Sequence, residues 1–292
     1  MNGHSLATAD GLPAATDDTL DVRQVSVHFG GLVALDNVSI TAQSRQVTGI
    51  IGPNGAGKTT LLNVLCGFVK PDAGAISFGG RGLGRIGPHR LARLGIARTL
   101  QGVGLFSGLT VTENVMVGAT SLARAGFWSG LLALPWSDRD EQRLRARALA
   151  ALELTGVAEH ADAMPETLAH GPRKRVALAR ALVAQPRLLL LDEPASGLAE
   201  DELAGLGELI TAVARDTTVV VIEHRMDLMM SVCQEIFVLD FGKVIASGTP
   251  AEVQADPAVT AAYLGTDAVA AESLAAEAEP ALPADQQEQA DD

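Results

Sequence analysis

The sequence predicts an α/β fold organised around a largely parallel sheet. Apolar runs of strand length occupy residues 47–51, 187–191 and 217–222, and segments long enough for helices separate them. These runs are apolar at nearly every position, which is typical of strands covered on both faces. A glycine-rich loop follows the first run and leads into a helical pattern from Lys58 to Cys66. Strands that alternate with helices in this way favour parallel pairing.

Other elements extend this core. Strand-like sequences at 22–27 and 34–42 flank a Gly-Gly turn, and a Pro-Asp-Ala-Gly turn at 71–74 precedes a further short strand. Residues 110–184 have a predominantly helical pattern. A hairpin is predicted at 237–246.

The composition indicates a chain that can bury a substantial core. Of its 292 residues 47% are hydrophobic, yet no apolar run approaches the roughly 18 residues that a membrane-spanning helix requires. The N-terminal residues lack the basic start and the apolar stretch of a secretory signal. Cys66 and Cys233 stand far apart without metal-type spacing, so we expect two buried free thiols in a reducing compartment.

The net charge of -13 is concentrated at the two ends of the chain. Residues 267–292 hold eight acidic and no basic residues, and residues 1–21 hold four acidic and no basic residues. The body between them is close to neutral, so its charge argues neither for nor against a nucleic-acid partner. Residues 1–19 and the tail at 267–292 are predicted to be disordered, because they have too few large apolar residues to form a core.

The strongest chemical signal is a phosphate loop between the predicted strand at 47–51 and the helix after it. It matches G-x-x-x-x-G-K-[ST] in the context that this motif requires. Glycines let backbone N–H groups turn toward phosphate oxygens, and the helix N-terminus adds partial positive charge. Lys58 can reach the β- and γ-phosphates, and Thr59 can offer its hydroxyl to Mg²⁺. The loop consists of Gly52, Pro53, Asn54, Gly55, Ala56, Gly57, Lys58, Thr59 and Thr60.

Polar residues also follow three other predicted strands. Asp192 and Glu193 end the leucine run at 187–191. There Asp192 can hold Mg²⁺ or its waters, and Glu193 can act on a water aimed at the γ-phosphate, as general base or water positioner. His224 follows the run at 217–222, where it can contact the γ-phosphate, and Gln101 follows a strand-like segment.

In this order the motifs resemble those of the ABC transporter ATPases. The motifs are the phosphate loop, Gln101, Leu-Ala-His-Gly-Pro at 168–172, Leu-Leu-Leu-Leu-Asp-Glu-Pro at 188–194, Ser-Gly-Leu-Ala at 196–199 and His224. The resemblance implies one α/β P-loop ABC ATPase domain at 20–266. Such a domain has a RecA-like core, an antiparallel β-subdomain and a helical subdomain, here at about 102–184.

The resemblance also implies roles by position. Phe29 matches the aromatic residue that stacks on adenine. Gln101 matches the glutamine that contacts Mg²⁺ and relays to the membrane subunits, and His224 matches the switch histidine. Two such domains sandwich two ATP molecules in this family, so the signature segment binds the γ-phosphate of the partner's ATP. That segment consists of Leu168, Ala169, His170, Gly171 and Pro172.

Further motifs are similar to the LivG-type subunit of branched-chain amino acid importers. They lie at 29–35, 97–101, 105–114, 127–135 and 256–265. This similarity implies a subunit that binds and hydrolyses ATP with Mg²⁺ and powers uptake of branched-chain amino acids or related small polar solutes. The implied partners are two membrane-spanning permease subunits, a second ATP-binding subunit and, indirectly, an extracytoplasmic solute-binding protein, with no nucleic acid. The implied location is peripheral, on the cytoplasmic face of the inner membrane.

Two departures from the family pattern predict an asymmetric dimer. The family signature is Leu-Ser-Gly-Gly-Gln, so Ala169 lacks the serine hydroxyl that would bond the γ-phosphate. Pro172 suits the first turn of a helix, so the segment should still begin a helix that faces phosphate. Ala199 replaces the usual aspartate after the carboxylates. We therefore expect a heterodimer in which the site completed by this signature is the weaker one.

Three alternatives stay open from the sequence. The subunit of a lipopolysaccharide-type exporter is disfavoured by the insertion at 120–143 and by Ala-Arg-Thr at 97–99. A soluble ABC ATPase of ribosomes or DNA is disfavoured by the single cassette and the lack of heptads. A regulator without hydrolysis is disfavoured by the intact phosphate loop and carboxylate pair. The aromatic segment at 121–136 is either a membrane-subunit contact or a local core. The basic run at 173–175 is interpreted as a solvated helix face near the ATP phosphates rather than a nucleic-acid patch.

Overall fold

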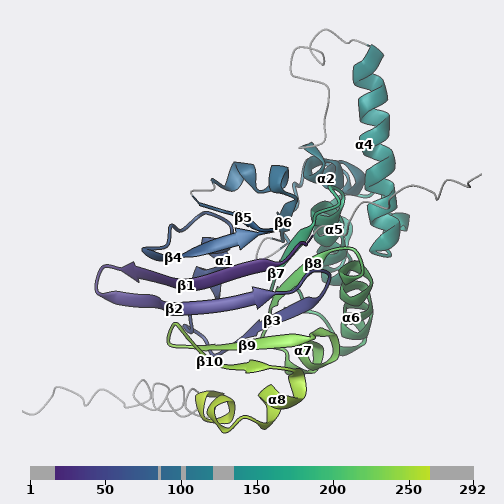
Figure 1. Ribbon diagram of the computed structural model, residues 1–292. Coiled ribbons are helices and arrows are strands. Elements are labelled where there is room, and N and C mark those ends of the chain that lie inside the picture. Colours follow the sequence, from purple (N-terminus) through teal and green to yellow (C-terminus); the bar gives the residue numbers. More distant parts are fainter. Residues whose placement is uncertain (1–16, 85–86, 100–102, 121–134, 264–292) are drawn as a thin grey trace, which may run out of the picture.

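The computed structural model describes residues 17–84, 87–99, 103–120 and 135–263, which form two sheets and a set of covering helices (Figure 1). Several residues singled out from the sequence lie outside these ranges. They are Gln101, Phe127, Trp128, Leu131, Leu132 and most of the two chain ends. Their predicted roles stay predictions.

The larger sheet has six strands in the order β10-β9-β3-β8-β7-β6. All its pairs are parallel except β10, which runs antiparallel to β9. Every residue of β3, β7 and β8 is buried, as the apolar runs predict. The strands are β3 (Val47–Ile51), β6 (Ile96–Arg98), β7 (Leu188–Asp192), β8 (Thr218–Ile222), β9 (Glu235–Asp240) and β10 (Lys243–Gly248).

The smaller sheet is antiparallel, in the order β2-β1-β4-β5. Its strands are β1 (Leu20–Phe29), β2 (Leu32–Ala42), β4 (Ala73–Phe78) and β5 (Arg81–Gly82). β4 begins inside the turn predicted at 71–74, because Gly74 fits against a bulge of β1 at Gln24. A Cβ on Gly74 would lie 2.4 Å from the Gln24 carbonyl oxygen, so glycine allows this pairing.

The helices lie between and beside these strands. They are α1 (Lys58–Leu65), α2 (Val111–Gly118), α4 (Pro135–Leu154), α5 (His170–Leu182), α6 (Glu200–Ala214), α7 (Met226–Val232) and α8 (Pro250–Ala255), with single 3₁₀ turns at Pro88–Arg90, Ala92–Leu94, Ala158–His160 and Pro165–Thr167. α2 and α8 begin with capping boxes in which Thr110 and Thr249 accept from the backbone N–H three residues later. These caps satisfy N–H groups that have no partner within the helix.

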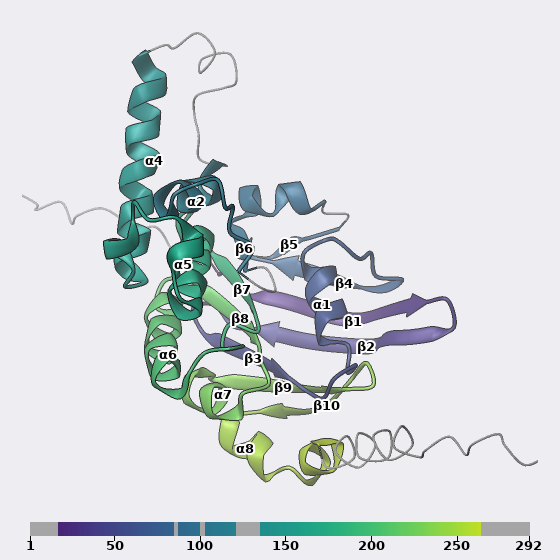
Figure 2. The ribbon, with the colours of Figure 1, turned by 180° about the vertical axis from the view of Figure 1, so that it is seen from behind.

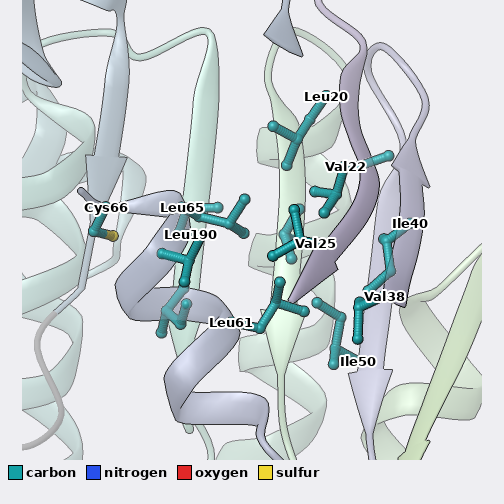
Figure 3. Close-up of a cluster of buried hydrophobic side chains, with 14 of the residues drawn as sticks. Leu20, Val22, Val25, Val38, Ile40, Ile50, Leu61, Leu65, Cys66 and Leu190 are labelled. Atoms are coloured by element: carbon teal, nitrogen blue, oxygen red, sulfur yellow. The ribbon is translucent and has the colours of Figure 1, made fainter. Parts of the chain in front are cut away.

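Alternation along the buried strands divides the core into two layers. On β7, Leu188 and Leu190 face one cluster with α1 and the smaller sheet, whereas Leu189 and Leu191 face the other with α6 and α7. Figure 3 shows the first layer, where Leu61 of α1 lies among side chains of both sheets. The large sheet is therefore covered on both faces, which is the environment that its sequence predicts.

A third cluster joins α2, α4 and α5, which lie together at one end of the molecule in both ribbon views (Figures 1 and 2). It forms a helical body, and α5 joins this body to the large sheet because its Leu178, Ala181 and Leu182 lie in the second sheet layer. Cys66 and Cys233 are free and buried, as expected. Among the helices that the structure describes, none is both long and apolar enough to cross a bilayer.

The contact between α2 and α5 gives a test of this helical body. A Cβ on Gly118, the last residue of α2, would lie 1.9 Å from the Arg180 carbonyl oxygen of α5. We expect Gly118→Ala to lower the free energy of unfolding by about 1–3 kcal/mol, because the helices must separate. Urea denaturation followed by circular dichroism measures this. Gly108→Ala is the control, since no atom lies within 4 Å of its Cβ position. Equal effects of the two changes would contradict the close approach.

Candidate functional site

The phosphate loop connects the end of β3 to the start of α1. Gly52, Gly55 and Gly57 have φ values of 151°, 81° and 102°. A Cβ on Gly52 would lie 2.1 Å from the Leu239 carbonyl oxygen, and one on Gly57 would lie 2.6 Å from that of Ala34. Gly55 is exposed, with no atom near its Cβ position. The glycines therefore hold the loop against the sheet and leave its outer side open.

Lys58 folds back across this loop. Its Nζ donates to the carbonyl oxygens of Gly52 and Pro53, each at 2.7 Å. Burial lowers the pKa of the Lys58 ammonium, and the Glu193 carboxylate partly opposes that shift. Lys58 and Glu193 therefore influence each other although they are far apart in sequence. Thr59, the next residue, is exposed at the start of α1.

Strand register places the candidate groups along one edge of the large sheet. Asp192 of β7 lies opposite Ile222 of β8, and Ile222 lies opposite Ile50 of β3. The phosphate loop, the carboxylate pair and His224 thus all follow the same row of residues. This is the carboxyl edge of the parallel strands, where ligands bind in open α/β sheets.

Asp192 is buried and forms an ion pair with Arg98. The Arg98 Nη2 and Asp192 Oδ2 atoms are 2.9 Å apart, and the two side chains are 12% and 3% exposed. Arg98 also donates to Asn63 Oδ1 of α1 at 2.9 Å. The Asp192 backbone N–H donates to Thr99 Oγ1 at 3.2 Å. β6 and α1 therefore fix the position of the Asp192 carboxylate.

Glu193 begins a tight turn after β7. Its φ is 46°, in the left-handed region that a residue with a side chain rarely adopts. Its N–H donates to the Ile222 carbonyl at 2.9 Å, and its own carbonyl accepts from Lys174 Nζ at 3.1 Å. Contacts from both sides hold the turn in this conformation, which is common at functional sites.

Glu223 and His224 directly follow β8. The His224 side chain is 57% exposed, whereas Glu223 is fully buried, and their Nδ1 and Oε1 atoms are 3.5 Å apart. The Ala195 N–H donates to Glu223 Oε2 at 3.4 Å. Burial raises the pKa of Glu223, although His224 and the Ala195 N–H oppose the shift.

The signature segment begins α5, as Pro172 in the first turn predicts. Ala169 is the N-cap, and its side chain makes no capping hydrogen bond. Leu168 is buried, whereas Ala169 and His170 are exposed. Among the described residues, no hydrogen bond or ion pair joins this segment to the phosphate loop. The structure therefore does not bring these two motifs of one chain together.

Phe29 lies at the tip of the β1–β2 hairpin and is 51% exposed, beside the exposed Leu32 and Val33. The same hairpin reaches the phosphate loop, because the Ala34 carbonyl of β2 abuts Gly57. An exposed aromatic ring on this element offers a flat apolar surface for stacking.

Two family models match the chain. One, described as ABC transporter, covers residues 35–196, and the other, described as branched-chain amino acid ATP-binding cassette transporter, covers residues 243–269. The chain belongs to the ABC transporter ATP-binding family. This membership confirms the resemblance drawn from its motifs.

Individual relatives and a solved structure support the family membership of this ABC ATPase. It is 42% identical to the high-affinity branched-chain amino acid transport ATP-binding protein LivG of Salmonella typhimurium, over 84% of this chain and 97% of the relative. It is 39% identical to BraF of Pseudomonas aeruginosa, over 84% and 97%. The ADP conformation of MJ1267, an ATP-binding cassette of an ABC transporter, matches with a TM-score of 0.73 and 30% identity, over 85% of this chain and 99% of that one.

The residues of this ABC ATPase fit a nucleotide phosphate with Mg²⁺. The phosphate loop has three glycines with positive φ, and its open side at Gly55 leaves room for a ligand. Hydroxyl and carboxylate oxygens suit Mg²⁺, and Thr59 and Asp192 supply one of each.

Two charged residues at this edge were not predicted from the sequence. Arg98 is the basic residue that ends β6, and Glu223 is the charged residue directly after the buried strand β8. Lys174 belongs to the basic run that was interpreted as a solvated helix face near the ATP phosphates. The solvated part of that interpretation is wrong, because Arg173, Lys174 and Arg175 are all partly buried and donate to backbone carbonyls.

The buried Glu223 gives a pH-dependent prediction. Its pKa is raised by burial, so its contribution to stability is favourable at low pH and is lost as pH rises through its folded-state pKa. The wild-type chain should therefore lose stability relative to Glu223→Gln between pH 5 and pH 8. Urea unfolding at both pH values measures the difference. Exposed Glu166, changed to Gln, should show no such divergence. Parallel curves for wild type and Glu223→Gln would contradict the burial effect.

Proposed function

We propose that this ABC ATPase powers the import of branched-chain amino acids or related small polar solutes. The observation that carries the proposal is the 42% identity to LivG over 97% of that protein. The second family model, over residues 243–269, supports the same cargo class. In this proposal the chain is a peripheral subunit on the cytoplasmic side of the membrane, and permease subunits form the path for the solute.

The proposed chemistry assigns a task to each group at the sheet edge. Lys58 and the loop N–H groups bind and orient the phosphates, and Phe29 stacks on the base. Thr59 and Asp192, with Gln101, hold Mg²⁺, which when bound neutralises charge on the phosphate oxygens. Glu193 accepts the proton of the attacking water or positions that water.

His224 completes the proposed site from β8. Its exposed ring lies next to buried Glu223, which restrains the ring at its Nδ1 side. In that position His224 can donate to the γ-phosphate. The contribution of His224 is therefore orientation and charge stabilisation rather than proton abstraction.

We also propose a heterodimer with a second ATP-binding subunit. Ala169 at the start of α5 supplies no side-chain hydrogen bond. A missing hydrogen bond to a charged group costs about 1.5–3 kcal/mol. The site completed by this signature is then weaker than the site built on Lys58 and Glu193, provided that the partner brings a complete signature.

A groove of about 380 Å³ next to β6 supports the proposed permease contact. Its lining includes Thr99, Phe106 and Arg180, between β6 and the helical body. Arg180 donates to the Gly104 carbonyl at 2.7 Å and lies 6.0 Å from the centroid of the Phe106 ring. Phe106 is 52% exposed, so this wall offers an apolar contact to a membrane subunit.

The first test changes the two central residues within the assembled transporter. Lys58→Ala should weaken ATP binding, whereas Glu193→Gln should retain binding and slow hydrolysis by roughly 10²–10⁴-fold, since a positioned base contributes that much. Leucine uptake into vesicles should fall with hydrolysis. Glu166→Gln serves as an exposed control. Near-normal turnover in Glu193→Gln would contradict the proposed role of Glu193 toward the attacking water. If vesicles hydrolysed ATP but took up no branched-chain amino acid, the proposed cargo would be wrong.

The second test addresses the asymmetry. The purified chain alone should be mostly monomeric and slow, and turnover should rise when the partner ATPase subunit is added. In the mixed dimer, Glu193→Gln should reduce turnover more than the equivalent change in the partner. Sizing by light scattering and steady-state hydrolysis measure both expectations. Equal losses from the two changes would show that the sites are equivalent and that the asymmetry is absent.

A further inference from the structure

Lys174 connects the helix that carries the signature to the turn that carries Glu193. It lies on α5, and its Nζ donates to the carbonyl oxygens of Glu193 and Pro194, at 3.1 Å each. α5 packs with α2 and α4 in the helical body, and its Leu178, Ala181 and Leu182 also pack into the core layer on the large sheet, whose strand β7 precedes Glu193. Near the start of α5, the Lys174 ammonium therefore makes a polar link from the signature helix to the proposed catalytic residue.

The turn needs such support because its backbone is strained. Glu193 has a φ of 46°, which costs energy for any residue with a Cβ. On one side its N–H is held by the Ile222 carbonyl of β8. On the other side Lys174 donates to the carbonyl oxygens of Glu193 and Pro194. The position of Glu193 thus depends on β8 and α5 together.

The charge of Lys174 is also oriented toward the sheet edge. Burial lowers the pKa of the partly buried Lys174 ammonium, and the Glu223 and Glu193 carboxylates at that edge partly oppose the shift. Its neighbours on α5 act differently. Arg173 donates to the Leu168 and Glu166 carbonyls, and Arg175 donates to the Thr155 carbonyl, all within the helical body. Of these three cations, Lys174 is the one that reaches the sheet edge.

We propose that Lys174 is a positioning residue that couples the placement of the signature helix to the placement of Glu193. The inference rests on the proposed role of Glu193 and on the proposed dimer. When the signature binds the partner's nucleotide, a shift of α5 carries Nζ with it and moves the Glu193 turn. Hydrolysis at the Lys58 site then depends on whether nucleotide occupies the other site.

Two substitutions in the full-length chain, assayed with its partner subunit, test the coupling. Lys174→Met keeps most of the side-chain volume but loses the donor, and Lys174→Arg keeps a donor. Lys174→Met should lower kcat roughly tenfold, the effect of one lost charge-assisted hydrogen bond, with the Kd for ATP changed by no more than about twofold. Lys174→Arg should restore most of the rate. Arg175→Met is the matched control, since its bond stays within the helical body.

A double-mutant cycle separates coupling from general damage. If Lys174 acts through Glu193, Lys174→Met should have no further effect on the residual hydrolysis of Glu193→Gln. Equal losses in both backgrounds, or a wild-type rate in Lys174→Met, would overturn the inference while leaving the proposed function intact. Should Lys174→Met fail to bind ATP, Lys174→Gln takes its place in the cycle. If wild-type hydrolysis proved independent of Glu193, the proposed function would fail, and this inference with it.

Discussion

The common end point of three buried parallel strands is the constraint on which the rest of the structure depends. β3, β7 and β8 have apolar side chains on both faces, so their polar successors can emerge only at the strand ends. The register aligns Ile50, Ile222 and Asp192 in one row. Residues that are more than a hundred positions apart in the chain therefore meet at one edge. The helices and the smaller sheet cover the faces and leave this edge open.

At that edge, cations from three different elements lie near the acidic residues. Arg98 of β6 pairs with Asp192, and Lys174 of α5 supports the turn of Glu193. Lys58 lies within the electrostatic influence of the same Glu193. The ion pair fixes the Asp192 carboxylate in a buried setting, where an unpaired charge would be costly. It also ties the sheet edge to three separate parts of the chain, so a change in one part reaches the others.

Much of this arrangement could be predicted from local sequence. The strands at 47–51 and 188–192 are continuous apolar runs, and the phosphate loop needs glycines at fixed spacing, so both signals are short-range. A short strand was predicted after the turn at 71–74, but its start at Ala73 could not be located from local sequence, because it depends on Gly74 meeting a bulge on another strand. The contacts of Arg98 and Lys174 were missed for a similar reason. Their partners are defined by the fold, and a basic residue on a helix or strand end carries no mark of the carbonyl or carboxylate that it will contact.

We propose that one sheet edge gathers the phosphate-binding, metal-binding and water-activating groups of this ABC ATPase. A crystal structure of the Glu193→Gln chain with ATP and Mg²⁺ is the decisive measurement. We expect the triphosphate along residues 52–60, the base on Phe29, and Mg²⁺ held by Thr59 with Asp192 directly or through a water. A nucleotide bound elsewhere, or a metal ion out of reach of Asp192, would contradict it.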